Sequence, residues 1–258
     1  MASETVPGPR MKALFSTDLA PCPYLAGRSE RRLVSVLAGP DPDADHDRLL
    51  RGGFRRSQRF AYRPACPGCT ACVPVRIPVA RFTFTRSWRR ILHRNADLAS
   101  RERPPHATEE QYVLFERYLN GRHDQSGMTE MTFDDYQAMV AETSVTSHLV
   151  EWRDPGHRLM AVSLTDRTRH ALSGVYKFFE PDEARRSLGS HIILWHVERA
   201  RELGLDHVYL GYWIAESPKM AYKARFQPLE QLTPHGWRPL PPVAAAAGAL
   251  PAERPDKP

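Results

Sequence analysis

The 258-residue chain lacks any run that approaches the roughly 18 uninterrupted apolar residues that a membrane-spanning helix requires. Its beginning, MASETVPGPRMKALF, contains no apolar core of the kind found in a secretory signal peptide. These absences argue against an integral membrane helix and a standard export signal. We therefore expect a soluble, cytoplasmic protein with no membrane partner.

Lysine and acidic residues are scarce in one long stretch. Between Arg48 and Arg103 there are fourteen arginines, no lysine, and only Asp97 and Glu102 as acids, within a chain of net charge +6. Arginine contacts phosphate through paired hydrogen bonds and stacks on bases, so the stretch is a candidate nucleic-acid-binding surface. The alternative is an arginine preference of a GC-rich genome combined with a solvated face.

Cysteine is also rare, and its spacing is unusual. Cys66, Cys69 and Cys72 form the loop CPGCTAC, and Cys22 is the fourth and last cysteine. Four thiols in a cytoplasmic chain point to a zinc or iron-sulfur site more than to disulfides. The fourth ligand follows by elimination only, and reduced thiols that pack as small apolar residues are an equal alternative.

The first 105 residues predict a small domain rich in cysteine and arginine. A proline pair after an arginine-rich stretch marks its end, and the proline- and alanine-rich C-terminus has little to bury. The predicted segments are a strand near 33–37, an acidic loop at 40–47, a basic helix or extended segment near 86–99, domains at 1–105 and 106–240, and a disordered tail at 241–258.

After residue 106 the pattern predicts helix, helix, strand, hairpin, helix, strand and helix. This order describes an α/β (α+β) domain in which helices pack on a mostly antiparallel sheet. The predicted segments are helices from 108 to 121 and from 132 to 143, strands at 146–152, 158–166 and 171–180, a helix at 190–204, a strand at 206–213 and a helix that opens at Ser217 and Pro218.

The segment RRSLGS stands between a predicted strand and a strong predicted helix. Backbone N–H groups at such a helix start can face an anion, and Arg185 and Arg186 add positive charge. The segment resembles the R/Q-x-x-G-x-G/A loop with which acetyltransferases of the GNAT superfamily hold a cofactor pyrophosphate, with Arg186 and Gly189 in matching positions. His191 stands where that loop has a final Gly or Ala, which argues against a standard acetyl-CoA cradle.

Four longer segments carry a more specific resemblance: GFRRSQRFAYRPACPGCTACVPVRIPVARF, SWRRILHRNADL, VYKFFEPDEARRSLGSHIILWHVERARELGL and VYLGYWIAESPKMAYKARFQPLE. From about Cys22 to Trp237 the chain resembles the bacterial aspartate/glutamate leucyltransferases, relatives of the eukaryotic arginyl-tRNA protein transferases. The resemblance implies transfer of leucine from leucyl-tRNA to the N-terminal amine of proteins that begin with Asp or Glu, whose product enters the N-degron pathway. It also implies a cysteine-bearing N-terminal domain followed by a GNAT-like acyltransferase domain.

An aminoacyl-tRNA ester is already activated, so such an enzyme must mainly position a neutral amine and stabilise a tetrahedral oxyanion. No nucleophile or cofactor is then required for the transfer, and no Ser/His/Asp or Cys/His arrangement stands out. The predicted residues are Tyr176, Arg186, Lys219 and Tyr222 for catalysis; Arg76, Lys177, Ser187, Leu188, Gly189, Tyr212, Lys223 and Arg225 for substrate binding, mainly as partners of the acceptor carboxylate; and Arg55, Arg56, Arg59, Arg89, Arg90 and Arg94 for tRNA binding.

These residues also have structural alternatives. Tyr212 can simply fill the sheet, and Lys223 or Arg225 can lie on a solvated helix face. His191 and His196 could relay a proton, but a histidine on a helix is more often structural.

Two other functions compete with the transferase. An acetyl-CoA-dependent N-acetyltransferase is favoured by the strand, loop and helix order and opposed by His191 and by the basic N-terminal half. A non-enzymatic tRNA- or metal-binding protein is opposed by the intact second domain. Leucine rather than arginine as the transferred residue rests on the likeness to the bacterial branch alone, and the sequence does not reveal the oligomeric state.

Overall fold

The computed structural model of the protein describes residues 13–122 and 129–242. Within these ranges, no helix has both the length and the apolar character needed to cross a membrane. The tail predicted at 241–258 lies outside the described residues from residue 243 onward.

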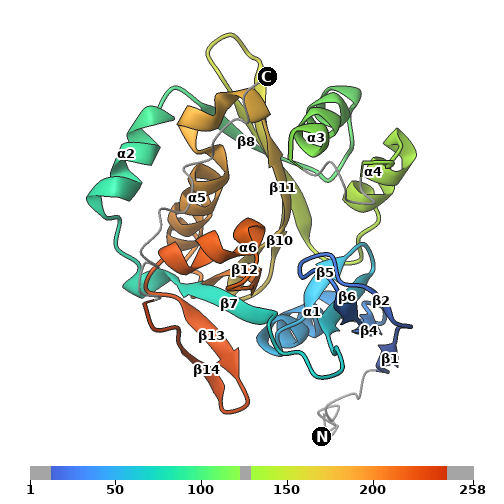
Figure 1. The fold of residues 1–258 in the computed structure, drawn as a ribbon. Coiled ribbons are helices and arrows are strands. Elements are labelled where there is room, and N and C mark those ends of the chain that lie inside the picture. Colours follow the sequence, from blue (N-terminus) through green and yellow to red (C-terminus); the bar gives the residue numbers. More distant parts are fainter. Residues whose placement is uncertain (1–12, 123–128, 243–258) are drawn as a thin grey trace, which may run out of the picture.

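An eight-stranded sheet forms the centre of the molecule (Figure 1). Its neighbouring strands are antiparallel except β11 and β12, which are parallel, so the predicted mixed α/β fold with a mostly antiparallel sheet is confirmed. In spatial order the strands are β14 (Gly236–Pro239), β13 (Glu230–Thr233), β7 (Val73–Pro78), β12 (His207–Trp213), β11 (Ala171–Phe179), β10 (Leu159–Arg167), β9 (Ser147–Arg153) and β8 (Ala99–Arg103).

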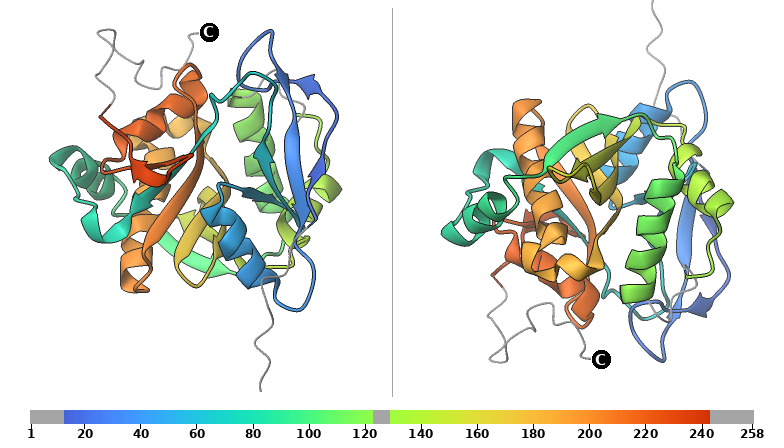
Figure 2. Two further views of the ribbon diagram at one scale, coloured as in Figure 1. Left: turned by 90° about the horizontal axis from the view of Figure 1, so that it is seen from below. Right: turned by 90° about the horizontal axis from the view of Figure 1, so that it is seen from above.

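Helices cover both faces of this sheet (Figures 1 and 2). One face carries α3 (Glu109–Arg122) and α4 (Phe133–Ala141), and the other carries α5 (Leu188–Glu202), with α2 (Arg86–Arg94) packed on the outside of α5. The start of α4 follows from local sequence, because Thr132 forms a capping box with the residue three positions later. The shorter helices are α6 (Pro218–Ala221), η1 (Val79–Arg81), η2 (Pro181–Arg186) and η3 (Tyr222–Arg225).

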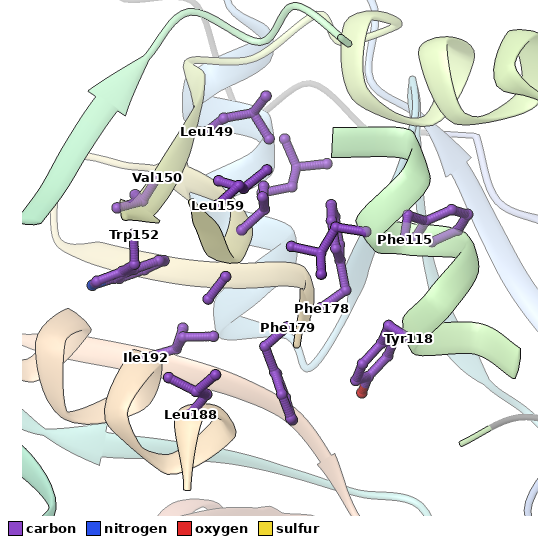
Figure 3. Close-up of a cluster of buried hydrophobic side chains, with 14 of the residues drawn as sticks. Phe115, Tyr118, Leu149, Val150, Trp152, Leu159, Phe178, Phe179, Leu188 and Ile192 are labelled. Atoms are coloured by element: carbon purple, nitrogen blue, oxygen red, sulfur yellow. The ribbon is translucent and has the colours of Figure 1, made fainter. Parts of the chain in front are cut away.

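Aromatic side chains fill the core between α3, α4 and the sheet (Figure 3). Phe115 of α3 meets Phe178 of β11 edge to face, with ring centroids 5.4 Å apart. Trp152 of β9 is 1% exposed. Burial of each such side chain contributes about 1.5–3 kcal/mol, so this core fixes the side of the sheet to which α3 docks.

The N-terminal residues form a second, four-stranded sheet that lies beside α1 (Pro42–Arg51). The predicted acidic loop at 40–47 is wrong, because most of it forms the first turns of α1. Asp41 caps this helix by accepting a hydrogen bond from the Ala44 N–H at 2.9 Å, and the acidic residues that follow complement the helix dipole. In spatial order the strands are β1 (Phe15–Ser16), β4 (Arg32–Val36), β6 (Phe60–Pro64) and β5 (Arg55–Ser57), and β2 (Ala20–Pro21) pairs separately with β3 (Ser29–Glu30).

The large sheet draws strands from both parts of the sequence. β7 and β8 precede residue 105, yet β7 pairs with β12 and β8 pairs with β9. The residues before 105 therefore contribute both the small sheet and part of the large one, and the division of the chain at residue 105 stays a prediction.

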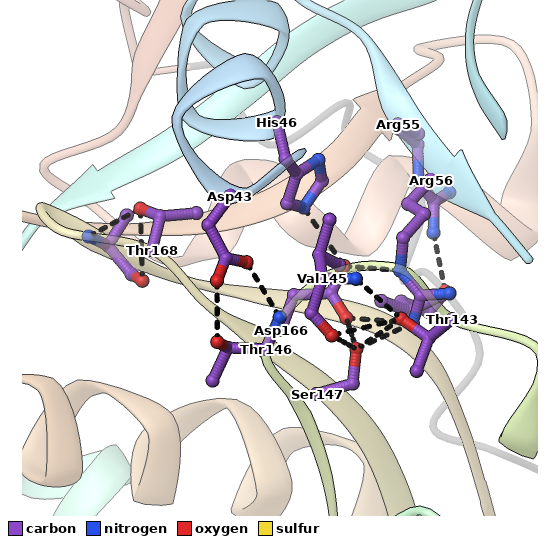
Figure 4. Close-up of polar contacts among 12 residues, drawn as sticks. Asp43, His46, Arg55, Arg56, Thr143, Val145, Thr146, Ser147, Asp166 and Thr168 are labelled. Carbon is purple, nitrogen blue, oxygen red and sulfur yellow. Dashed lines mark hydrogen bonds and ion pairs between the residues drawn. The ribbon is translucent and has the colours of Figure 1, made fainter. Parts of the chain in front are cut away.

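A buried ion pair joins the two sheets (Figure 4). The Arg56 guanidinium donates two hydrogen bonds of 2.7 Å to the two carboxylate oxygens of Asp166 on β10, and both side chains are fully buried. His46 of α1 lies 3.0 Å from the same carboxylate. Burial alone would raise the pKa of Asp166, but the charge of Arg56 and the hydrogen bonds from His46 and Arg56 hold this pKa well below its usual range.

The sequence predicts that Arg56 binds tRNA, and its position corrects that prediction. Its guanidinium is inaccessible to solvent and fully engaged, so a phosphate cannot reach it. Arg56 holds the small sheet against the large one.

We predict that Arg56→Met lowers the free energy of unfolding by about 3–5 kcal/mol, because it leaves the Asp166 charge buried without its main partner. Arg59→Met, an exposed arginine of the same hairpin, should change stability by no more than about 0.5 kcal/mol. Urea titrations at neutral pH would measure both values. Equal effects of the two substitutions would contradict the structural role of Arg56.

Candidate active site

The parallel strands β11 and β12 separate halfway along their length. They pair only from Ala171 to Ser173 with His207 to Tyr209, although β11 continues to Phe179 and β12 to Trp213. We call the space between the separated halves of these two strands the gap. Its neighbours are the first turn of α5, where the Gly189 carbonyl accepts a hydrogen bond from Lys177 of β11, and the segment α6–η3, from which Lys223 donates to the Tyr212 carbonyl of β12.

Arg55 of β5 enters the gap from the side of the small sheet. Its Nη2 donates a hydrogen bond of 2.7 Å to the Val175 carbonyl of β11. On β12 the guanidinium lies against Gly211, where an added Cβ would come within 2.7 Å of it. Gly211 also has a φ of +74°, so this position requires glycine for two reasons. Arg55, predicted to lie on a tRNA-binding surface, is instead placed between the two strands.

Two lysines approach the gap from the side of α5 and η3. Lys177 Nζ donates to the Gly189 carbonyl at 2.6 Å and lies 5.5 Å from the centre of the Tyr222 ring. Lys223 Nζ donates to the Tyr212 carbonyl at 2.6 Å. Burial, followed by the charges of Arg55 and Lys177, lowers the pKa of Lys223 well below its ordinary value of 10.5.

The gap therefore gathers positive charge. In the ranges 13–122 and 129–242, no carboxylate pairs with Arg55 or Lys223. Buried charges in proteins are normally paired, so an anionic group that enters the gap would find cations already in place.

The first turn of α5 packs closely against β11. Ser187 adopts a left-handed conformation with φ of 52° and makes no side-chain cap, and Leu188 behind it is 1% exposed. A Cβ at Gly189 would lie 3.0 Å from the Phe179 ring, so glycine lets the helix approach β11. Of these three predicted substrate-binding residues, Gly189 contacts a cation of the gap directly, through Lys177.

The four predicted catalytic residues do not converge on one point. Tyr222 lies beside Lys177, and Lys219 is exposed on α6. Tyr176 packs instead against Phe115 of α3, with ring centroids 5.9 Å apart, because successive residues of a strand point to opposite faces.

Arg186 lies at the junction of α2 and α5. It pairs with Asp97 through hydrogen bonds of 2.8 and 2.9 Å. This pair raises the pKa of Arg186 and lowers that of Asp97.

Two further predicted substrate-binding residues lie outside the gap. Arg76 of β7 pairs with Glu230 at 2.8 Å, and its guanidinium lies 4.2 Å from the Trp237 ring centre. Arg225 is exposed and lies over the Trp88 ring at 5.5 Å. Neither side chain contacts the three cations described above.

Tyr212 is a structural part of the gap. Its side chain is 1% exposed, and its hydroxyl lies within hydrogen-bonding distance of the Gly53 and Tyr62 carbonyls, at 3.1 and 3.0 Å. It therefore connects β12 to the small sheet, in agreement with the structural alternative.

The two helix histidines are buried. His196 Nδ1 lies 2.7 Å from the Ile192 carbonyl, so that nitrogen donates, and Nε2 accepts from the Thr165 hydroxyl at 2.8 Å. Burial lowers the pKa of His196 to about 3 and that of His191 to about 4. His196, with both nitrogens occupied, fits the structural alternative rather than a proton relay.

The cysteine loop lies close to the gap, since Cys72 contributes to the electrostatic environment of both Lys223 and Tyr212. Burial and then the charges of the other three thiols raise the pKa of Cys72 to about 12. Cys69 accepts a hydrogen bond from Arg28 at 3.3 Å. In the described part of the chain, however, no three His, Cys, Asp or Glu side chains are arranged to hold a metal ion, so the thiols do not form a ready ligand set.

The remaining predicted tRNA-binding residues occupy two separate places. Arg89, Arg90 and Arg94 are exposed on α2, whereas Arg59 is exposed on the hairpin of β5 and β6. Figures 1 and 2 show α2 and the small sheet at opposite sides of the molecule. The arginine-rich stretch is therefore not one continuous surface.

We predict that Lys223 titrates below 10.5 and that Arg55→Met raises its pKa, because this substitution removes a nearby positive charge. The chain has five lysines, so carbon-13 labelling of lysine and NMR titration would follow each Cε, with Lys223→Met giving the assignment. Arg59→Met serves as the control and should leave the pKa unchanged. A Lys223 that titrates near 10.5 in all variants would refute the proposed charge cluster.

The chain is also similar to known proteins over most of its length. The chain matches the family models "Arginine-tRNA-protein transferase, N terminus" over residues 20–90 and "Arginine-tRNA-protein transferase, C terminus" over residues 110–233. A solved structure of L-PGS from Bacillus licheniformis covers 66% of this chain and 50% of its own, with 11% identity and a TM-score of 0.45, which is too low to carry an argument.

Curated relatives are much closer in sequence. An aspartate/glutamate leucyltransferase of Gluconacetobacter diazotrophicus is 51% identical over 92% of this chain and 91% of its own length. Another, of Parvibaculum lavamentivorans, is 51% identical over 90% of this chain and 96% of its own length. With these relatives, the chain belongs to the arginine-tRNA-protein transferase family of aminoacyltransferases.

Proposed function

We propose that this protein transfers leucine from leucyl-tRNA to the N-terminal amine of proteins that begin with Asp or Glu. The relatives named aspartate/glutamate leucyltransferase support this substrate pair. The observation that carries the proposal is the gap between β11 and β12, in which Arg55, Lys177 and Lys223 meet.

In this proposal, the cations of the gap hold the acidic side chain of the acceptor. A carboxylate accepts strong hydrogen bonds from a guanidinium, and Arg55 has donors left beyond the one used on Val175. The negative charge would also favour protonation of Lys223, which is disfavoured while only cations surround it. Asp and Glu at the N-terminus would thereby be distinguished from their amides.

The transfer itself needs no separate nucleophile. The acceptor nitrogen bonds to the leucyl carbonyl carbon, the bond from that carbon to the ribose oxygen breaks, and the proton lost by nitrogen ends on that oxygen. Lys177 and Tyr222, beside each other at the opening of the gap, are placed to stabilise the oxyanion that forms between these steps. Bringing amine and ester together supplies the rest of the rate enhancement.

A single set of assays tests the function. The protein is mixed with labelled leucyl-tRNA, arginyl-tRNA or acetyl-CoA and with peptides that begin with Asp or with Asn. We expect label to move from leucyl-tRNA to the Asp peptide. Transfer from arginyl-tRNA would show that arginine and not leucine is the transferred residue. Transfer from acetyl-CoA alone would overturn the proposal.

We predict that Arg55→Met lowers kcat/KM for the Asp peptide by roughly ten- to hundredfold, because a hydrogen bond to a charged group contributes about 1.5–3 kcal/mol. For the Asn peptide, the loss should be much smaller. Arg169→Met, at an exposed arginine on the turn between β10 and β11, is the control and should leave both values unchanged. An equal loss for both peptides would show that Arg55 supports the fold of the site and not acid recognition.

The exposed arginines of α2 are proposed to bind the tRNA backbone. We predict that a variant with Arg89, Arg90 and Arg94 changed to Gln binds leucyl-tRNA more weakly and that its affinity depends less on salt, with a slope smaller by about one unit for each phosphate that the variant no longer neutralises. Arg169→Gln, an exposed arginine on the turn between β10 and β11, should retain the original slope. Affinity that stays flat between low and moderate salt in the unchanged protein would contradict binding by this surface.

A zinc ion or iron-sulfur cluster on Cys22, Cys66, Cys69 and Cys72 stays a prediction. Cys22, Cys66 and Cys69 each contribute to the raised pKa of Cys72, which supports it, whereas the lack of a ready ligand set in the described residues opposes it. Anaerobic purification followed by iron, zinc and thiol analysis would decide. Four titratable thiols without metal would refute the site.

A further inference from the structure

Apolar side chains are exposed together on the small N-terminal sheet. Phe15 is 58% exposed, Phe60 42% and Val36 39%. In the described residues, the other exposed large hydrophobic side chains are Leu14 and Leu19 of the N-terminal segment and Val113 on α3. Grouped exposure of this kind marks an interaction surface more often than scattered single residues do.

The strand register places these residues on one face. Phe15 pairs with Val34 on β4, and Val36 pairs with Phe60 on β6. Alternate residues of a strand share a face, so Val34 and Val36 lie on the same side together with Tyr62. The other face carries the buried residues Ser35, Arg56 and Ala61. We call the exposed face, made by Phe15, Val34, Val36, Phe60 and Tyr62, the platform.

The charged residues at the platform positions are arginines. Arg32 lies on the same face of β4, with its guanidinium 5.0 Å from the centre of the Tyr62 ring, and it donates hydrogen bonds of 2.6 and 3.2 Å to Glu30. Arg55 pairs with Tyr62 across β5 and β6 and so shares the face. Exposed aromatic rings interleaved with arginines are suited to stacked bases and phosphates.

The platform is continuous with the gap. The Tyr62 carbonyl lies 3.0 Å from the Tyr212 hydroxyl of β12, and the two rings are 6.4 Å apart. Arg55, at the same end of the platform, reaches the Val175 carbonyl inside the gap. A chain that lies across the platform would therefore end beside the cations.

We propose that the platform binds the unpaired 3′ end of the aminoacyl-tRNA by stacking its bases on Phe60 and Phe15. This inference rests on the proposed function, because it supplies the path by which the aminoacyl ester reaches the gap. Unpaired RNA ends are the part of a folded RNA whose bases are free to stack on aromatic side chains. Stacking tolerates any base, so the platform accepts the end without reading its sequence.

The test uses the full chain and a tRNA in which a fluorescent adenine analogue replaces an unpaired base that precedes the terminal nucleotide, since the terminal nucleotide carries the ester that reaches the gap. Binding to the unchanged protein should quench the fluorescence by stacking. A variant with Phe15→Ala and Phe60→Ala should bind at least about fivefold more weakly and lose most of the quenching, because it removes both stacking surfaces. Val113→Ala, the exposed apolar residue of α3, is the matched control and should change neither value.

A second tRNA that lacks the unpaired end separates stacking from general binding. The double variant and the unchanged protein should bind this truncated tRNA equally well. If the double variant lost affinity equally for whole and truncated tRNA, or lost affinity for neither, the inference would be overturned. A changed sedimentation of the double variant would also overturn it, because it would show that the platform is an interface between two copies of the chain. Quenching does not require leucine transfer. The stacking test would therefore still give a clear answer if the proposed function failed.

Discussion

Two consecutive arginines on β5 connect the N-terminal sheet to the candidate active site. Neighbouring residues of a strand point to opposite faces, so Arg56 and Arg55 leave β5 in different directions. Arg56 is buried against Asp166 of β10, which fixes β5 on the large sheet. Once β5 is fixed, Arg55 is directed to Val175 of β11 and into the gap. The buried ion pair thus determines the position of the Arg55 guanidinium in the gap.

The gap depends on the backbone of β11 and β12 as well as on side chains. Parallel strands that stayed paired to their ends would leave no room for the Arg55 guanidinium between them, and here pairing stops after Ser173 and Tyr209. Gly211 follows on β12 with a positive φ and leaves room for the Arg55 guanidinium. The register between β12 and β7 also shifts at this glycine. Gly211 therefore allows both the irregularity in β12 and the close approach of the Arg55 guanidinium to that strand.

The cations of the gap repel one another, and a negatively charged substrate can offset this repulsion. Burial of Lys223 near Arg55 and Lys177 disfavours its protonated form. An acidic side chain would reverse this effect, whereas an amide of the same shape would not. Selectivity for acidic acceptors can therefore arise from unfavourable electrostatics in the empty site as well as from direct contacts in the complex.

Much of the fold is predictable from local sequence. Apolar periodicity locates β9, β10, β11, α5 and β12, because each buries a regular face, and the capping residues locate the starts of α3 and α4. The error at 40–47 is avoidable, since Asp41 followed by a proline and acidic residues is a helix-start signal. Lys177, Gly189, Tyr222 and Lys223 are predicted site residues that lie together.

Other features were decided only by the tertiary structure. The sequence offers Arg55 and Arg56 as equivalent members of an arginine-rich stretch, and only the docking of β5 makes one a buried anchor and the other a cation of the gap. Likewise, the exposure of Phe15 and Phe60 depends on which face of the small sheet is covered. Local sequence determined the secondary structure elements because their patterns are periodic. The roles of single side chains depended on contacts between residues more than 100 positions apart, and no local pattern encodes those contacts.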